Sequence, residues 1–486
     1  MPDLLSDQRD MEFTIFEQLQ ADKLCAHEPY KEFSRDLFEM IMTESLKMSA
    51  REAMPLNAVG DREGCRMEDG QVNVPKAFQE PWRLFTEWGW IVLTEPPDVG
   101  GQGIPQVIGL TCLEHTLAAN YSFYSFLSLT KGAVRLIQNF GTEDQKNRYM
   151  FKMLEGQWAG TMCLTEPNAG SDVGAVKTMA KRNPDGTFSI SGSKIFITDG
   201  DHDLTENIIH PVLARIEGAP AGTRGISLFL VPKYCVNDDG SLGEFNDIKV
   251  TGLEEKMGLH GSPTCAMNFG EDGKCVGELL GEENRGMRIM FQMMNEARLG
   301  VGLAGMALAS TAYLHSLEYA KERIQGTDFR EAGNPDAPSV PIIRHPDVRR
   351  MLMYMKSLVE GMRGMIYFGA YCMDRVSIAT DDEDRSKWQG FVDLLIPVIK
   401  GYSSEMGFRV VETAMQVYGG YGYVSEYPVE QFLRDSKITS IFEGTNGIQA
   451  MDLVGRKLGM KGGSIFDRFL GEIGDFVALA REKAGL

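Results

Sequence analysis

A glutamate beside an aromatic residue and a flexible turn stands out in the segment 434–449. Glu443 follows Phe442 and precedes Gly444 and Thr445. The glycine frees the backbone next to the carboxylate, so a flat group could approach it closely, and the threonine adds a hydroxyl donor. A carboxylate held over an apolar, planar partner suits proton abstraction from carbon. An acidic residue in a surface loop would show the same pattern, so this segment alone leaves both interpretations open.

A second segment, 164–172, combines a rigid residue, a flexible residue and two hydroxyls. Pro167 fixes the chain direction, Gly170 allows close approach to the backbone, and Thr165 and Ser171 offer hydroxyl groups. A segment of this composition can hydrogen-bond the polar edge of a ring system and a phosphate beyond it. The same residues are typical of an ordinary turn.

The stretch 159–280, which must position this second segment, predicts a small antiparallel β domain. Its short apolar or alternating runs are bounded by Gly, Pro, Asn and Asp. One run, within 192–200, carries an aromatic ring, Phe196, and a hydroxyl, Thr198, a pattern that is equally typical of sheet core. The other runs lie at 188–190, 212–216, 226–231 and 265–269.

Helical spacing of apolar residues dominates the chain on both sides of this β domain. Residues 1–158 are predicted to be mainly helical, interrupted by a Pro- and Gly-rich loop at 96–103. Helical spacing returns over 284–460, where the apolar stripe 348–366 predicts one long bundle helix. A weaker repeat follows in the tail, 461–486. The remaining predicted helical stretches are 11–24, 30–54, 75–88 and the series Tyr313, Leu317, Ala320 and Ile324.

Length, charge and cysteine content limit the class of protein and its partners. The chain has 486 residues, enough for two or three domains and a large core. Its net charge of −19 argues against a nucleic-acid partner and an anionic membrane surface. No apolar run reaches about 18 residues, so no membrane span is expected, and the N-terminus resembles neither a secretory signal nor a transit peptide. The 8 cysteines are scattered, which favours reduced thiols in a reducing compartment.

Several common catalytic signatures are missing from the sequence. No Gly-x-Gly-x-x-Gly opens a βαβ unit, no Walker-type loop is present, and no Gly-x-Ser-x-Gly nucleophile elbow appears. The 7 histidines do not cluster at ligand spacing. We therefore expect neither a Rossmann nicotinamide site nor a metal site.

The segments described above, in their order along the chain, resemble those of the acyl-CoA dehydrogenase family. Residues 164–172 are similar to the family's flavin loop, and 194–200 are similar to the strand that backs the flavin ring. The resemblance covers roughly residues 75 to 460. Each motif is weak by itself, but together and in register they identify the chain as a member. The other matching segments are 141–146, 416–422, 426–430 and 434–435.

The resemblance implies an α+β, acyl-CoA dehydrogenase-like fold. Its expected parts are an N-terminal α-helical domain (1–158), an antiparallel, β-barrel-like middle domain (159–280), a C-terminal four-helix bundle (284–460) and a short helical tail (461–486). The stretches 201–210, 219–233 and 446–453 look like the longer members, a subgroup that includes 3-methylmercaptopropionyl-CoA dehydrogenases. Those proteins usually carry a further helical domain. This sequence ends at Leu486, so we expect that domain to be either reduced to one helix or cut.

The resemblance also implies a reaction and its base. The family uses FAD to desaturate an acyl-CoA thioester and passes the electrons to an electron-transfer flavoprotein. By this match the Glu443 carboxylate removes the α-proton, and its backbone N–H helps to hold the thioester carbonyl; an apolar site would raise the pKa of Glu443. A minority of the family places the base at the position of Ala297, which cannot act, and Glu296 is the next residue to test. Arg298 matches an arginine near the base and could orient the carboxylate, a surface salt bridge being the alternative.

Cofactor contacts implied by the resemblance lie in several parts of the chain. Arg323 matches an arginine that reaches the FAD pyrophosphate of the neighbouring subunit, and Gln416 and Gly420 match contacts to the adenosine half. FAD binding would then require a homodimer or a homotetramer. Phe196 stands where many members have tryptophan, and Gly447 stands where several short members have a glutamine that touches FAD, so that contact is expected to be lost. The other expected FAD contacts are Leu164, Thr165, Gly170, Ser171, Thr198 and Thr445.

Competing functions remain open at this point. We expect a cytoplasmic dehydrogenase whose partners are an acyl-CoA substrate and an electron-transfer flavoprotein. An acyl-CoA oxidase or an AidB-like flavoprotein would keep the fold, and a non-catalytic acyl-CoA binder would keep only the binding. Oxygen reactivity of the reduced protein, or failure to bleach bound FAD, would separate these. Straight-chain, methylthio, alicyclic and aryl-substituted acyl groups all remain possible.

Overall fold

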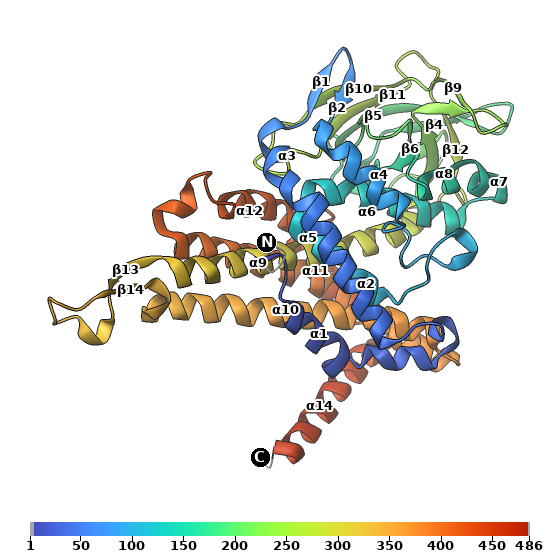
Figure 1. Ribbon diagram of the computed structural model, residues 1–486. Helices are drawn as coiled ribbons and strands as arrows, with labels where there is room; N and C mark the ends of the chain where they lie inside the picture. Colours follow the sequence, from blue (N-terminus) through green and yellow to red (C-terminus); the bar gives the residue numbers. More distant parts are fainter. Residues whose placement is uncertain (1–3, 485–486) are drawn as a thin grey trace. The chain divides into compact units, whose positions relative to one another are not determined.

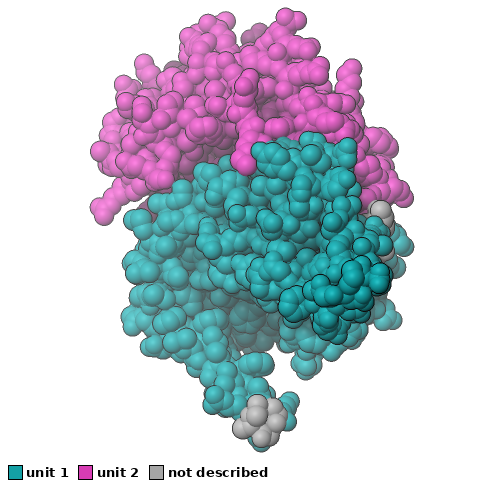
Figure 2. All heavy atoms as spheres, turned by 90° about the vertical axis from the view of Figure 1, so that its left-hand side faces the viewer, with its two compact units in different colours: residues 1–47, 104–118, 298–486 teal, residues 48–103, 119–297 magenta. Residues whose placement is uncertain are grey.

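The computed structural model describes residues 4–484, and the chain divides into two compact units (Figures 1 and 2). Unit 1 is formed by Met1–Lys47, Ile104–Ala118 and Arg298–Leu486, and unit 2 by Met48–Gly103 and Ala119–Ala297. Each unit therefore gathers segments that lie far apart in the sequence.

Unit 2 is built on a β-sheet that has eight strands within residues 4–484. The strands follow the order β10-β11-β5-β12-β7-β6-β3, and β4 pairs with β5 and β6. Two separate hairpins, β1–β2 and β8–β9, accompany the sheet (Figure 1). The bounds are β1 Arg66–Glu68, β2 Gln71–Asn73, β3 Trp158–Gly160, β4 Met179–Arg182, β5 Phe188–Thr198, β6 Asn207–Ile216, β7 Ile226–Pro232, β8 Tyr234–Val236, β9 Leu242–Phe245, β10 Ile248–Leu253, β11 Thr264–Phe269 and β12 Val276–Leu279.

The prediction of an antiparallel sheet is only partly correct. Most neighbouring strands are antiparallel, as in the long pairing of β6 with β7. However, β3 and β4 both run parallel to β6. A parallel pair needs a long connection between its strands, and short apolar runs do not reveal which strands such a connection joins. The side chains between the strands form one apolar core that includes Phe188, Ile190 and Phe229, all almost fully buried.

Short helices of unit 2 precede and flank the sheet. The longest of them, α6, begins where the Asn120 side chain accepts a hydrogen bond from the N–H of Phe123. The predicted helix start at 141–146 is present as α7, where Thr142 and Gln145 form a reciprocal capping box. The bounds are α3 Asn57–Glu63, α4 Gln79–Glu87, α6 Tyr121–Phe140, α7 Glu143–Gln145 and α8 Phe151–Leu154.

Unit 1 is helical and contains the predicted long bundle helices. The stripe 348–366 lies in α10, which packs along α11 (Figure 1). Helices α9 and α11 approach closely at Gly305 and Gly407, where an added Cβ on Gly407 would lie 2.3 Å from the carbonyl oxygen of Gly305. The bounds are α1 Gln8–Glu12, α2 Arg35–Met48, α5 Gln106–Ala119, α9 Gly286–Glu322, α10 Pro346–Ile378, α11 Asp382–Tyr418, α12 Val429–Ser436, α13 Asn446–Asp452 and α14 Ser464–Ala484. Residues 286–297 of α9 belong to unit 2.

Several predicted helix boundaries are wrong. The stretch predicted at 11–24 is interrupted at Gln20, which adopts a left-handed conformation (φ 53°). The stretch predicted from residue 30 becomes α-helical only at Arg35. Helix α9 ends at Glu322, so Ile324 belongs instead to a β-hairpin of β13 (Ile324–Thr327) and β14 (Ser339–Pro341). Apolar spacing alone locates a helix better than it locates the helix ends.

Helix α9 is long and apolar enough to cross a membrane by length and composition alone. However, 89% of its most apolar window is buried inside the protein, as expected for a core helix. The predicted tail helix is α14, where Ile465 and Phe469 pack against the cluster around Phe391.

Candidate active site

In unit 2, β5 turns an aromatic ring outward at Phe196. This residue has a positive φ of 56°, and 59% of its surface is exposed. The pairing of β11 with β5 shifts register between Cys265 and Met267, so the strand bulges opposite this point. A bulky residue in this conformation costs roughly 1–3 kcal/mol and is typical of functional sites. Thr198 ends the same strand and is half-buried.

The 164–172 loop is attached directly to β5. The N–H of Ile195 donates to the carbonyl of Thr165 at 3.0 Å, and a tight turn is closed by mutual hydrogen bonds between Glu166 and Ala169. Leu164 is buried and Thr165 is half-buried. The remaining predicted contact residues of this loop, Gly170 and Ser171, are exposed. The structure thus places the predicted loop beside the predicted strand.

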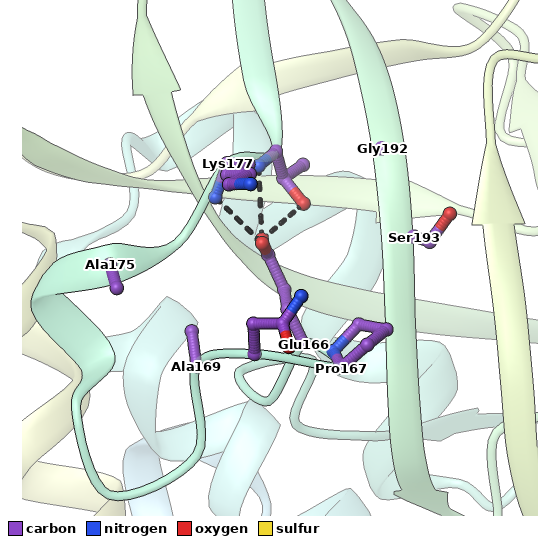
Figure 3. Close-up of a pocket in the computed structure, with 9 residues that line it drawn as sticks. Glu166, Pro167, Ala169, Ala175, Lys177, Gly192 and Ser193 are labelled. Atoms are coloured by element: carbon purple, nitrogen blue, oxygen red, sulfur yellow. Dashed lines mark hydrogen bonds between the residues drawn. The ribbon is translucent and has the colours of Figure 1, made fainter.

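The side chain of Glu166 fixes this loop to neighbouring segments of the chain. Its carboxylate accepts hydrogen bonds from the N–H of Lys177 at 2.6 Å and from the N–H and hydroxyl of Thr178 at 3.0 and 2.6 Å (Figure 3). The buried Lys194 ammonium lies 2.9 Å from the carboxylate and also donates to the carbonyl of Leu164 at 3.1 Å. Burial alone would raise the pKa of Glu166, but Lys194 and the other donors hold it below its usual range. Sequence reasoning did not single out this ion pair.

A pocket of about 230 Å³ lies beside the anchored loop. It is lined by the turn 166–169, by Lys177 and Thr178, and by Gly192 and Ser193 of β5 (Figure 3). The amides of Lys177 and Thr178, which line this pocket, already donate to the Glu166 carboxylate. The pocket lies next to the residues predicted to hold a cofactor.

In unit 1, Glu443 lies in a strained turn immediately before α13. Its φ is 55°, and the following residue, Gly444, has a φ of 86°. Thr445 caps α13, since its hydroxyl accepts a hydrogen bond from the N–H of Ile448 at 3.3 Å. The buried side chain of Gln449 donates to the carbonyls of Glu443 and Gly444 at 3.3 and 3.0 Å. The helix that follows the turn therefore also fixes its shape.

Arg298 approaches the same turn from α9. Its Nε donates to the main-chain carbonyl of Glu443 at 3.3 Å, and its Nη1 lies 3.6 Å from Asp452 of α13. The side chain is almost fully buried. These contacts place Arg298 where it supports the backbone that carries the glutamate.

The Glu443 carboxyl group is electrostatically suited to act as a base near neutral pH. Within the described part of the chain, its Oε2 is buried without a hydrogen-bond partner. Burial raises the pKa of Glu443 to about 7, against the opposing effects of Arg298 and Lys400. Lys400 was missed by sequence reasoning, although a lysine directly after the apolar run 394–399 was an available signal.

The neighbouring acidic candidate, Glu296, has a different environment within unit 2. Its carboxylate forms an ion pair with Arg135, with an Oε1–Nη1 distance of 2.8 Å. Ala297, at the alternative position for a base, has no ionisable group. These observations favour Glu443 over Glu296.

The residues predicted to contact the pyrophosphate and the adenosine half of FAD lie near the C-terminal ends of α9 and α11. Tyr319 of α9 stacks on Tyr418 of α11 with ring centroids 4.1 Å apart. Arg323, just beyond α9, is exposed and lies 5.5 Å from the ring centroid of Tyr421. Gln416 and Gly420 are exposed at the end of α11 and in the turn that follows. An accessible guanidinium beside this cluster is suited to paired phosphates.

Within residues 4–484, no group of three or more His, Cys, Asp or Glu side chains is arranged to hold a metal ion.

Known proteins match this chain over nearly its whole length. The acyl-CoA dehydrogenase N-terminal, middle and C-terminal domain models match residues 43–157, 161–271 and 284–458. A 3-methylmercaptopropionyl-CoA dehydrogenase of Ruegeria pomeroyi is 41% identical over 95% of this chain and 77% of its own length. A butyryl-CoA dehydrogenase of Syntrophomonas wolfei is 39% identical over 99% of this chain and 80% of its own.

A solved structure supports the same assignment. An acyl-CoA dehydrogenase from Bacillus anthracis, complexed with FAD, superimposes with a TM-score of 0.72 at 25% identity, covering 90% of this chain and 70% of that one. Sequence, domain models and fold agree: the chain belongs to the acyl-CoA dehydrogenase family.

Proposed function

We propose that Glu443 is the base of an FAD-dependent acyl-CoA dehydrogenation and that the acyl group is short and unbranched. Family membership makes the protein an FAD-dependent oxidoreductase acting on acyl-CoA. The observation that carries the assignment of the base is the Glu443 carboxyl, with a buried, unpartnered oxygen and a pKa raised by burial to about 7.

The residues of the chain fit a flavin. Phe196 presents an exposed aromatic ring from β5, and the adjacent loop offers the hydroxyls of Thr165 and Ser171. Arg323 supplies an accessible cation for phosphates. We propose that Leu164, Thr165, Gly170, Ser171, Phe196, Thr198, Arg323, Gln416, Gly420 and Thr445 hold FAD. When bound, FAD supplies the acceptor for the two electrons that leave the substrate.

The role of the chain's own residues follows from their positions. Glu443 accepts the α-proton on a carboxylate oxygen that no other described group occupies. Arg298 and Gln449 hold the carbonyl of Glu443, so the base keeps its position while charge develops on the substrate. A donor on the thioester carbonyl would stabilise the developing enolate, and we assign that role to the N–H of Glu443.

The acyl group is inferred from the relatives named above. One is named for a butyryl thioester and another for a methylthio-propionyl thioester. A thioether sulfur occupies about the space of a methylene, so both are short, linear chains to an apolar pocket. The test is an anaerobic screen that follows loss of flavin absorbance. We expect butyryl-CoA, pentanoyl-CoA and 3-(methylthio)propionyl-CoA to bleach the flavin much faster than palmitoyl-CoA or 3-phenylpropionyl-CoA; the reverse order would refute the short linear assignment.

We also propose the biological setting of the reaction. An electron-transfer flavoprotein is the acceptor, the protein is cytoplasmic, and it assembles as a homodimer or homotetramer, because Arg323, Gln416 and Gly420 would serve the FAD of a neighbouring subunit. We propose in addition that the chain consists of an N-terminal helical domain (1–158), a middle β domain (159–280) and a C-terminal helical bundle (284–460). Fast reoxidation of the reduced protein by oxygen, but not by an electron-transfer flavoprotein, would favour an oxidase instead.

Arg323→Ala is expected to weaken FAD binding. Wild-type protein should carry about one FAD per chain, and removal of a charge-assisted phosphate contact should cost roughly 1.5–3 kcal/mol of binding free energy. The measurement is FAD retention after gel filtration together with the dissociation constant of reconstituted protein. Arg330→Ala is the matched control, because Arg330 is also exposed but is paired with Asp328. Equal retention by wild type and Arg323→Ala would exclude this contact.

Flavin reduction should speed up as the pH rises through about 7. Glu443 must be ionised to accept a proton, and burial raises its pKa to about 7. Below this pH the acid form dominates and the rate should fall about tenfold per pH unit. Anaerobic stopped-flow measurements from about pH 5 to about pH 9, which is about two units on either side of the expected midpoint, would check this. A rate that is constant across that range would contradict the assignment.

A further inference from the structure

A buried lysine lies behind the Glu443 turn. Lys400 belongs to α11, and its surface is 0% exposed. Lysine is almost never fully buried unless it is paired. Its hydrogen-bond partner in the structure is the neutral side-chain oxygen of Asn446, 3.1 Å from Nζ. This ammonium group therefore has no hydrogen-bonded carboxylate among the described residues.

Asn446 links this lysine to the candidate base. It is the first residue of α13 and follows Glu443 by three positions. Ser404, one turn along α11 from Lys400, donates to the same Asn446 oxygen at 2.9 Å. Two donors from α11 thus hold the start of α13, and with it the turn that carries Glu443.

Several charged groups lie near Lys400 and the Glu443 turn. Arg298 of α9 lies 3.6 Å from Asp452, and Asp452 is also paired with Arg456 at 2.7 Å. Arg298 and Lys400 both lower the pKa of the Glu443 carboxyl, and Arg298 has the larger effect. Lys400 and Glu443 attract each other electrostatically. Glu443 Oε2 and Asn446 Nδ2 are both buried without a hydrogen-bond partner in the part of the chain that the structure describes.

We propose that Lys400 is a positioning residue for proton abstraction: it holds Asn446 and the Glu443 turn, and its positive charge favours the ionised form of the Glu443 carboxyl. This inference rests on the proposed role of Glu443 as the base. It assigns to α11 an electrostatic function in addition to its packing.

The protonation equilibria agree with this geometry. Burial lowers the pKa of Lys400 to about 8, although Glu443 opposes that shift and Arg298 adds to it. Lys400 therefore still carries positive charge at neutral pH. Loss of an opposite charge raises a carboxyl pKa, and Lys400 is the second charge, after Arg298, that lowers the pKa of Glu443. Without Lys400, Glu443 would ionise only at more alkaline pH.

The test measures the ionisation of Glu443 directly, in FAD-loaded protein without substrate. The protein is labelled with ¹³C at the glutamate carboxyl carbons, and the Glu443 resonance is the one absent from Glu443→Gln. We compare wild type with Lys400→Met, Lys400→Gln and Lys400→Arg. Lys400→Gln keeps a donor for Asn446 and loses only the charge, so it decides the outcome if Lys400→Met fails to fold. Lys387→Met removes a lysine from a distant part of α11 and is the control.

We expect both neutral variants to raise the titration midpoint of Glu443 by up to about one unit, and to shift the pH profile of flavin reduction equally. Lys400→Arg should restore the wild-type midpoint. An unchanged midpoint in the neutral variants, or an equal shift in Lys387→Met, would overturn the proposal. Failure of the proposed base is a separate result, since Glu443→Gln would then reduce its flavin at the wild-type rate.

Discussion

Glu443→Gln should retain FAD and bind acyl-CoA, yet lose most of its flavin reduction. The amide keeps the size of the side chain but cannot accept the α-proton. Loss of a general base typically costs 10²–10⁴-fold in rate. Ala297, at the alternative position for the base, has no carboxylate that could replace Glu443. The loss of rate is therefore expected to be at the upper end of this range. The measurement is anaerobic stopped-flow bleaching of the flavin with a substrate from the acyl-CoA screen.

The matched control for this experiment is Glu296→Gln. It makes the same chemical change at the neighbouring acidic candidate, which is paired with Arg135. We expect Glu296→Gln to bleach at close to the wild-type rate once its FAD content is matched. If the two variants exchange these behaviours, Glu296 is the base and Glu443 is a structural residue of the turn.

Much of the fold could be predicted because apolar periodicity is a local property of the sequence. The stripe 348–366 identifies α10, and the runs at 212–216 and 226–231 identify parts of β6 and β7. The parallel pairing of β3 and β4 with β6 depends on contacts between distant residues, which periodicity does not encode. The family resemblance could supply the architecture but not the individual pairings.

The sequence predicts which residues form the candidate site. It predicts less well the backbone conformations and the neighbouring side chains that hold those residues in place. Glu443 and Phe196 follow from their segments, but nothing local reveals that both adopt a positive φ. The structure also assigns to Arg298 a contact with the carbonyl of Glu443, where sequence reasoning had suggested the carboxylate. Lys194 and Lys400 were missed because a lysine in an apolar run becomes informative only when its burial and its partner are known.

Lys194→Met should release the 164–172 loop and with it the FAD. Lys194 is fully buried, and its ammonium lies 2.9 Å from the Glu166 carboxylate. Breaking a buried ion pair on one side leaves the other charge uncompensated and costs roughly 3–5 kcal/mol. In this variant the uncompensated charge is that of the Glu166 carboxylate, whose remaining hydrogen-bond donors come from Lys177 and Thr178. The lost contact to the carbonyl of Leu164 further frees the loop.

The double variant Lys194→Met/Glu166→Gln separates charge burial from loop anchoring. Removing both charges should recover most of the thermal stability lost in Lys194→Met, because neutral partners avoid an unpaired buried charge. FAD affinity should recover less, since the link between Lys194 and the carbonyl of Leu164 is still absent. Lys181→Met is the control, because Lys181 is an exposed lysine on the adjacent strand β4. Thermal unfolding and FAD titration of the four proteins measure both effects. If Lys194→Met matches Lys181→Met in both, the ion pair does not hold the loop, and the anchoring must come from the other hydrogen bonds of Glu166 and from that of Ile195 to the carbonyl of Thr165.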